Sequence, residues 1–111
     1  MHSGVFSLGK IILIPFPFTD LSGVKVRPAV IISNKSIGDD ILVAFISTNT
    51  KKKSHFEIVV KMNNQNGLKS DSTVVVSKIA TLEKKTVLGE IGKLSKSEIL
   101  QVKKKLKDLF F

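Results

Sequence analysis

Arg27 is the residue whose type and position most directly suggest chemistry. Seventeen of the 18 basic residues are lysine, and Arg27 is the single arginine. A guanidinium group is a rigid, permanently charged fork that fits a phosphate, whereas lysine is a solvated point charge. Because Pro28 follows it, Arg27 is expected in extended geometry at the mouth of a strand, where it could stabilise charge developing on a phosphate. A salt bridge to Asp20 in the preceding loop is the alternative role.

A cluster of hydroxyl and amide side chains, Ser47-Thr48-Asn49-Thr50, ends an apolar segment. Hydroxyl groups at a strand end can bind a phosphate or orient the 2′-hydroxyl of a sugar, and they equally form the local hydrogen bonds of a turn. His55 follows this cluster, and its imidazole could act as a general base because it titrates near neutrality. A solvated histidine at a strand edge is the alternative.

Two further groups of residues fit a polyanionic ligand. Lys51-Lys52-Lys53 would contact phosphates if their loop lies near the ligand, although such runs are usually just solvated. Phe16 and Phe18 could stack on bases, although packing in the core is the more frequent use of phenylalanine. The net charge of +9 and the pI near 9.9 create a positive potential that attracts RNA or DNA.

Short strands must position these residues. Apolar and β-branched composition predicts strands at Lys10–Pro15, Pro28–Ser33, Ile41–Ser47, His55–Val60, Ser72–Ser77 and Thr86–Leu94. Proline has no N–H for a ladder, so Pro15 and Pro17 are expected to end the first strand and Pro28 to open the second. Gly89 and Gly92 predict a bulge or bend in the last strand.

The C-terminal segment is predicted to be a helix. Ser95 and Glu98 have the spacing of a capping box, in which each side chain bonds the other residue's backbone N–H. Apolar residues then recur at helical spacing and leave the lysines off the stripe; they are Ile99, Val102, Leu106 and Leu109. Five or six strands with a terminal helix predict a small β-barrel or an α+β domain.

Length and composition exclude several classes of protein. The 111 residues are expected to form one domain, residues 1–111, with an ordinary hydrophobic fraction of 42%. Without cysteine there is no disulfide, thiolate nucleophile or cysteine-ligated zinc, and His2 and His55 lie too far apart to suggest a metal pair. No apolar run approaches the ~20 residues that span a bilayer, and no signal peptide is evident. A cytoplasmic protein without a membrane association is therefore expected.

The order of motifs resembles the MazF/PemK toxin family. A strand leads into Pro-Phe-Pro-Phe-Thr-Asp at residues 15–20, and Arg-Pro-Ala at 27–29 opens the next strand. Residues 67–72, 78–82 and 91–94 look like later segments of the family, so the resemblance covers nearly the whole chain. It implies a mainly β fold, a small SH3-like β-barrel with a C-terminal helix. It also implies a toxin of a type II toxin–antitoxin system.

The resemblance further implies an activity, partners and a site. The expected activity is sequence-specific cleavage of single-stranded RNA without a metal or cofactor, leaving a 2′,3′-cyclic phosphate and a 5′-hydroxyl. The expected partners are RNA, a cognate antitoxin and a second copy of the chain. Arg27 matches the family's arginine, and Ser47, with Thr48 beside it, matches the threonine at the end of the third strand. The residues expected to bind RNA are Phe16, Thr19, Asp20, Lys25, Asn49, Lys51, His55 and Ser77.

The chain departs from the family pattern at three positions. Members often carry an acid at the position of Ser77 and an arginine at that of Ala80, and some carry an arginine near Val75. His55 or Glu57 then becomes the candidate base. The missing charges motivate a second hypothesis, a non-catalytic relative that binds nucleic acid or a partner protein. A gyrase-poisoning toxin on the same fold has little support, since the motifs resemble the ribonuclease branch.

Overall fold

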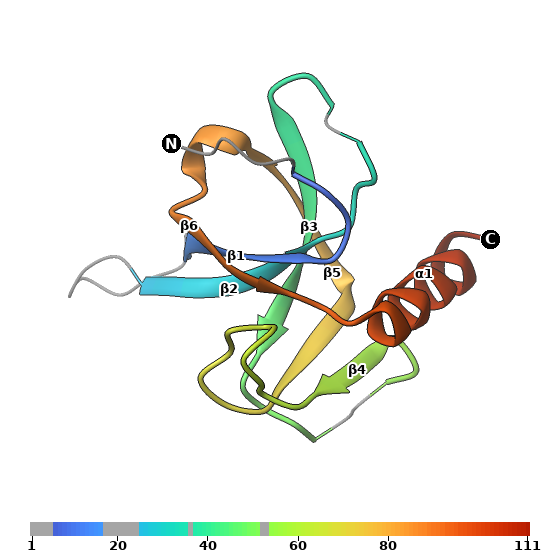
Figure 1. Ribbon diagram of the computed structural model, residues 1–111. Coiled ribbons are helices and arrows are strands. Elements are labelled where there is room, and N and C mark those ends of the chain that lie inside the picture. The colour runs from blue at the N-terminus through green and yellow to red at the C-terminus, as the bar shows by residue number, and fades with distance from the viewer. Residues whose placement is uncertain (1–5, 17–24, 36, 52–53) are drawn as a thin grey trace.

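The computed structural model describes residues 6–16, 25–35, 37–51 and 54–111. The described elements are six strands, a short 3₁₀ helix and a C-terminal α-helix (Figure 1). Their bounds are β1 Lys10–Phe16, β2 Lys25–Ile31, β3 Asp40–Ser47, β4 Glu57–Val60, β5 Ser72–Glu83, η1 Lys84–Thr86, β6 Gly89–Lys93 and α1 Lys96–Phe110. The expected mainly β fold with a terminal helix is therefore confirmed.

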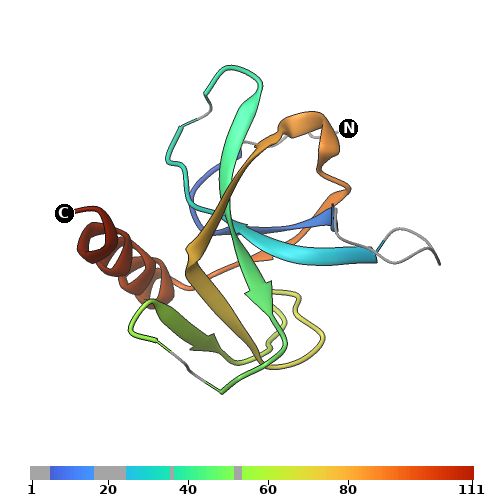
Figure 2. The same cartoon turned by 180° about the vertical axis from the view of Figure 1, so that it is seen from behind.

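The strands form one antiparallel sheet in the order β4-β5-β3-β2-β1-β6. The sheet curls strongly, so that β1 and β2 run across the direction of β3 and β5, while α1 lies at one side near β4 (Figures 1 and 2).

Buried apolar side chains form two clusters, as expected for strands whose alternate residues point to opposite faces. One cluster includes Ala44, Val76 and Val102 and packs against α1. The other includes Ile12, Ala29 and Val43 and fills the opposite side of the curled sheet. Both faces of the central strands β2 and β3 are consequently buried, which fixes their register.

The prolines occupy different positions from those predicted. Pro28 lies in the middle of β2, opposite Leu13, and Pro15 lies within β1, opposite Val26. Both expectations of a strand boundary at these residues were wrong. The described pairing of β2 with β3 begins only at Ala29, and that of β1 with β6 ends at Leu13. Each proline is therefore paired on one side, where a missing N–H is tolerated. Pro17 lies outside the described residues.

The last three strands also differ from the predicted bounds. β4 begins at Glu57 because residues 54–56 form a turn, and β5 continues past Ser77 to Glu83. The predicted strand 86–94 is shortened to β6, because η1 occupies its beginning. Its register against β1 shifts between Ile11 and Ile12, so the irregularity expected from the glycines is confirmed.

The strongest local deformation is in β5. Ala44 of β3 pairs with Ile79, whereas the next residue, Phe45, pairs with Val75. Residues 76–78 are thus extra residues on β5, and the strand bends sharply there (Figure 2). A bulge re-aims side chains and increases the local twist. This bulge determines which residues of β5 face the site described below.

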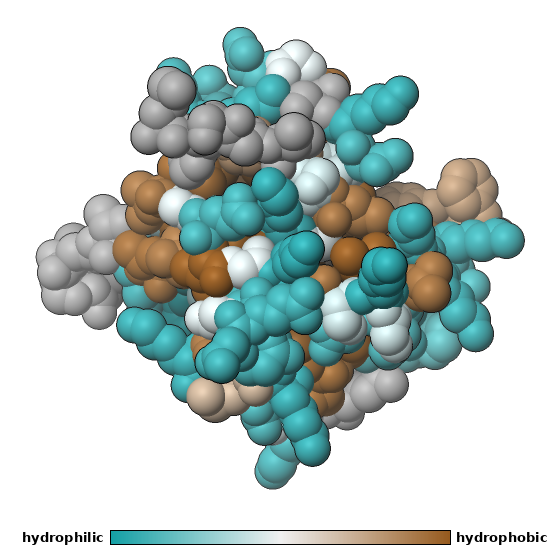
Figure 3. Space-filling view, in the orientation of Figure 1, coloured by the Kyte–Doolittle hydropathy of each residue, from teal (hydrophilic) through white to brown (hydrophobic). Residues whose placement is uncertain are grey.

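The C-terminal helix begins as predicted. The Ser95 hydroxyl accepts a hydrogen bond from the Glu98 backbone N–H at 3.1 Å, and the Glu98 carboxylate accepts one from the Ser95 N–H at 2.9 Å. Val102 is buried, and the other three residues of the apolar stripe are partly buried. Among the described residues no helix is long and apolar enough to cross a membrane. Hydrophilic side chains predominate on the face shown in Figure 3, with apolar patches between them.

Candidate functional site

Arg27 and Ser47 lie on the same face of the curled sheet. Ala29 of β2 pairs with Phe45 of β3. Arg27 and Ser47 lie two residues beyond this pair on their strands, and a step of two keeps a side chain on the same face. Both residues are partly buried and line one cavity of about 240 Å³. The structure thus brings two of the candidate residues predicted from the sequence, the lone arginine and the hydroxyl at the end of β3, to the same cavity.

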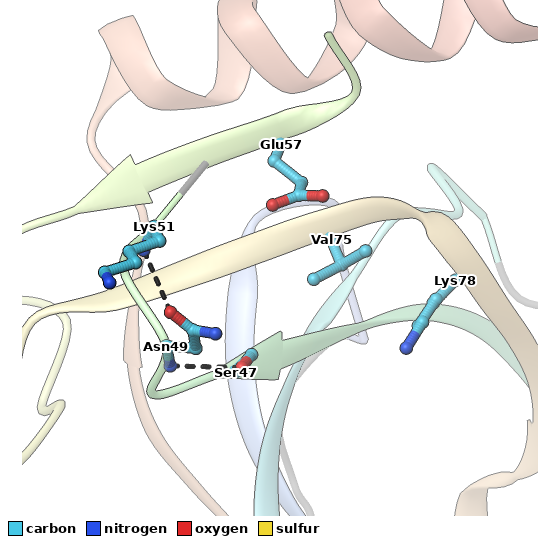
Figure 4. A pocket seen from close by; sticks show the side chains of 6 residues that line it. All are labelled: Ser47, Asn49, Lys51, Glu57, Val75 and Lys78. Atoms are coloured by element: carbon cyan, nitrogen blue, oxygen red, sulfur yellow. Dashed lines mark hydrogen bonds between the residues drawn. The ribbon is translucent and has the colours of Figure 1, made fainter. Parts of the chain in front are cut away.

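A second cavity of about 230 Å³ adjoins the first. Ser47, Val75 and Lys78 line both cavities. We call the two cavities together the β3–β5 groove. The described residues that line it are Arg27, Phe45, Ile46, Ser47, Asn49, Lys51, Glu57, Val75 and Lys78. Figure 4 shows one end of it, where side chains from β3, β4 and β5 converge.

The segment that follows β3 is held by side-chain hydrogen bonds. The Ser47 hydroxyl oxygen accepts the Asn49 backbone N–H at 3.1 Å, and Asn49 Oδ1 accepts the Lys51 backbone N–H at 3.0 Å. The Thr73 hydroxyl of β5 donates to the Asn49 carbonyl at 2.8 Å. The turn interpretation of Ser47 and Asn49 is therefore confirmed. The Ser47 hydroxyl still has its own hydrogen to donate to a ligand.

Glu57 is the carboxylate that lines the groove. It begins β4 and pairs with Val75, which pairs in turn with Phe45, so the three residues form one row across the sheet. The Ser54 hydroxyl donates to Glu57 Oε2 at 3.4 Å. Ile58 and Val60 point into the core, so alternation turns Glu57 to the groove side. That alternation was visible in the sequence.

Lys78 is the groove residue that sequence reasoning missed. It lies at the end of the bulge in β5 and lines both cavities, while its neighbour Ser77 is exposed and lines neither. In Figure 4 its side chain extends from β5 toward β3. The predicted strand stopped at Ser77, and the residue pattern carries no signal for the bulge that brings in Lys78.

His55 lies away from the groove. Its Nε2 is 3.2 Å from Asp108 Oδ2 on α1, and its side chain is 61% exposed. The ring also contacts Phe56 edge-on, and Lys105 of α1 donates to the His55 carbonyl. The structure thus places His55 in the contact between the 54–56 turn and the helix. Between the two candidate bases, only Glu57 lines the groove.

The remaining predicted site residues are placed as follows. Lys25, Thr48 and Ser77 are exposed and line neither cavity. Phe16 ends β1, and its side chain is not among the described features. Thr19 and Asp20 lie outside the described residues, and so does the proposed salt bridge of Asp20 with Arg27. The catalytic role of Thr48 and the RNA-binding roles of the other five residues remain predictions.

The described residues of the groove carry a net positive charge. Among them, Arg27, Lys51 and Lys78 face one carboxylate, that of Glu57. Lys78 forms no ion pair with any residue that the structure describes. The described residues contain no group of three or more histidine, aspartate or glutamate side chains that could hold a metal ion.

The arrangement suits a phosphodiester. Cations at intervals along a groove bind the backbone of a single strand. A guanidinium beside a hydroxyl can donate to the non-bridging oxygens of one phosphate, and a carboxylate on the opposite wall can accept a proton. The groove therefore combines anion binding with acid–base groups.

Comparison with known proteins gives a family match. A family model described as "PemK-like, MazF-like toxin of type II toxin-antitoxin system" matches residues 7–110. No curated protein sequence matches the chain significantly.

Solved structures match over nearly the full chain. The toxin MazF-mt6 of Mycobacterium tuberculosis is 22% identical, with a TM-score of 0.73 over 91% of this chain and 95% of that one. MazF of Deinococcus radiodurans is 15% identical, with a TM-score of 0.74 over 96% and 97%. A mycobacterial endoribonuclease in complex with its cognate antitoxin is 16% identical, with a TM-score of 0.71 over 92% and 91%. At these identities the likeness shows a shared fold.

Proposed function

The chain belongs to the PemK-like, MazF-like toxin family of type II toxin–antitoxin systems, and from this premise we propose that it is a metal-independent endoribonuclease. Its substrate would be single-stranded RNA, cleaved at specific short sequences in the β3–β5 groove. The observation that carries the proposal is the convergence of Arg27, Ser47 and Glu57 on this groove. The matching solved structures include mycobacterial endoribonucleases, which supports the same activity.

The proposed reaction is attack of the 2′-hydroxyl on the neighbouring phosphate. Glu57 accepts the 2′-hydroxyl proton, which makes the oxygen a better nucleophile. Arg27 donates to the non-bridging oxygens as negative charge accumulates on them, and Ser47 donates its hydroxyl hydrogen to the same phosphate. The products are a 2′,3′-cyclic phosphate and a 5′-hydroxyl. Thr48 is retained as a second candidate hydroxyl, since it follows Ser47 directly.

The proposed partners are an antitoxin and a second copy of the chain. An antitoxin with an acidic segment would bind the positive β3–β5 groove and exclude RNA from it. The complex of a similar mycobacterial endoribonuclease with its cognate antitoxin supports this partner. The proposed compartment is the cytoplasm, where RNA and such an antitoxin would be available.

The proposed face of the homodimer is an apolar groove beside α1. It has a volume of about 450 Å³ and lies between Leu8 and Ile32 on one side and Leu106 on the other. At its rim, Phe110 and Phe111 are 61% and 101% exposed. A two-fold interface uses the same patch on both copies, so the phenylalanines of each copy can enter the groove of the other. This combination of an apolar groove and adjacent aromatic residues favours a second copy as the occupant.

RNA cleavage in the presence of EDTA tests the proposed activity. Purified protein is incubated with a long single-stranded RNA, and the ends of the fragments are mapped and analysed for a cyclic phosphate. We expect discrete cleavage sites with the wild type and loss of cleavage with Arg27→Ala. Lys104→Met, an exposed residue on α1 outside the groove, is the control and should cleave as the wild type does. Salt-dependent RNA binding with no cleavage would refute the proposal in favour of a non-catalytic binding protein.

A further inference from the structure

The proposed reaction needs a proton donor for the leaving group. When the P–O5′ bond breaks, the 5′-oxygen leaves with negative charge unless a positioned acid protonates it. Arg27 is a poor source of this proton, because a guanidinium stays protonated in proteins. His55 pairs with Asp108 outside the groove. The lysines of the β3–β5 groove are the remaining described donors.

Lys78 is better placed for this role than Lys51. Lys51 lines only the cavity that Glu57 also lines, on the side of the proposed base, whereas Lys78 lines that cavity and also the one that contains Arg27, in both cases together with Ser47. A phosphate held between Arg27 and Ser47 would therefore have Lys78 as a neighbour. The bulge at residues 76–78 produces this position, since it adds residues to β5 where β3 has none.

Lys78 and Glu57 also approach the groove from different walls. Glu57 comes from β4, and Lys78 comes from the bend of β5, with Val75 between them in Figure 4. In-line displacement requires the attacking 2′-oxygen and the leaving 5′-oxygen on opposite sides of the phosphorus. A base and an acid on separate walls satisfy this requirement. The Lys78 ammonium group forms no ion pair with the residues that the structure describes.

We propose that Lys78 is the general acid that protonates the leaving 5′-oxygen. This assignment rests on the proposed ribonuclease function. In the step, Glu57 takes the proton of the 2′-hydroxyl, the O2′–P bond forms, and the P–O5′ bond breaks. Lys78 Nζ gives one proton to the 5′-oxygen and becomes a neutral amine, while Glu57 becomes a neutral acid. Proton exchange with water then restores both groups, so the cycle consumes no further reactant.

A substrate whose leaving group needs no proton tests the assignment. An RNA oligonucleotide containing a mapped cleavage site is made in two forms, one ordinary and one with sulfur in place of the bridging 5′-oxygen. A thiolate leaves readily without protonation, so the second form bypasses a general acid. The variants are Lys78→Met, which removes the proton donor and keeps an unbranched side chain, and Lys104→Met, which removes one exposed charge outside the groove. Circular dichroism and thermal unfolding verify that both variants are folded.

We expect Lys78→Met to slow cleavage of the ordinary RNA by about 10²-fold or more. On the sulfur-containing RNA it should slow cleavage by less than about tenfold, while Lys104→Met should leave both rates close to those of the wild type. An equal loss on the two substrates would overturn the assignment, because a residue that binds phosphate or supports the fold affects both alike. Wild-type rates with Lys78→Met would overturn it as well. If the wild-type protein cleaves neither RNA, the proposed ribonuclease function itself fails.

Discussion

Replacing Arg27 by lysine separates two contributions of the guanidinium to the proposed activity. One is its positive charge, which attracts RNA, and the other is its planar fork of N–H donors. Arg27→Lys keeps the net charge of +9 and removes only the planar fork of N–H donors. The general attraction of the protein for RNA should therefore persist, whereas the fork can no longer donate two parallel hydrogen bonds to one phosphate. We expect a severe loss of cleavage with little change in binding.

The groove sets the size of each effect. The three cations among its described residues, Arg27, Lys51 and Lys78, predict a contribution of about −2 to the slope of the logarithm of RNA affinity against that of salt concentration, since each phosphate contact to a single strand adds about −0.7. Arg27→Lys should keep this slope, and Arg27→Ala should make it shallower by about 0.7. Loss of one preorganised donor to a charged transition state lowers the catalytic rate by about 10²–10³-fold.

Two measurements on the same RNA distinguish these effects. Single-turnover cleavage in EDTA gives the rate of the chemical step. Binding is measured over a range of salt concentrations with an RNA that carries a 2′-deoxynucleotide at the cleaved position and therefore cannot react. If Arg27→Lys cleaves within about threefold of the wild type, the guanidinium fork has no specific role. If the salt slope of Arg27→Lys becomes as shallow as that of Arg27→Ala, the lysine at position 27 does not bind the phosphate that the arginine binds.

Five further substitutions, at four positions, test the site, the fold and the dimer. Ser47→Ala should slow cleavage about 10- to 100-fold through loss of a hydrogen bond to a charged group, whereas Ser47→Thr should retain most activity; equal rates for the two would contradict a role for the hydroxyl. Ser95→Ala removes the helix cap and should lower the free energy of unfolding by about 1 kcal/mol in urea denaturation, and an unchanged midpoint would contradict the cap. Gly92→Ala places a Cβ 2.3 Å from the Gln65 carbonyl oxygen, so we expect a loss of about 1–3 kcal/mol or more, and wild-type stability would show that this contact relaxes freely. Phe110→Asp should convert a dimer to a monomer in light scattering, and an unchanged mass would assign the interface elsewhere.

The helix was predictable because its signals are local. Ser95 and Glu98 determine its start within one turn, and the apolar stripe through Val102 determines the face that packs on the sheet. Alternation in β4 likewise predicted which side chains are buried. These patterns depend on neighbours within a few residues, so the rest of the chain has little influence on where the helix begins or which side chains are buried.

Strand boundaries at the prolines were not predictable in the same way. A proline within a strand is tolerated when the side that lacks an N–H has no partner. For Pro28 this depends on where β3 stops pairing with β2, and for Pro15 on where β6 stops pairing with β1. Both depend on residues far away in sequence. Local composition therefore cannot decide them.

The charged residues of the β3–β5 groove were also not predictable from local sequence. Alignment with the family pattern drew attention to Val75, Ser77 and Ala80, because charged residues are missing there. Of these, only Val75 lines the groove; Ser77 is exposed and Ala80 packs against an apolar cluster. The groove instead has an acid from β4, Glu57, and a cation from the bulge, Lys78. Missing charges along one strand therefore do not mean that the groove lacks them, since a curled sheet lets an adjacent strand and a bulge supply charges to the same groove.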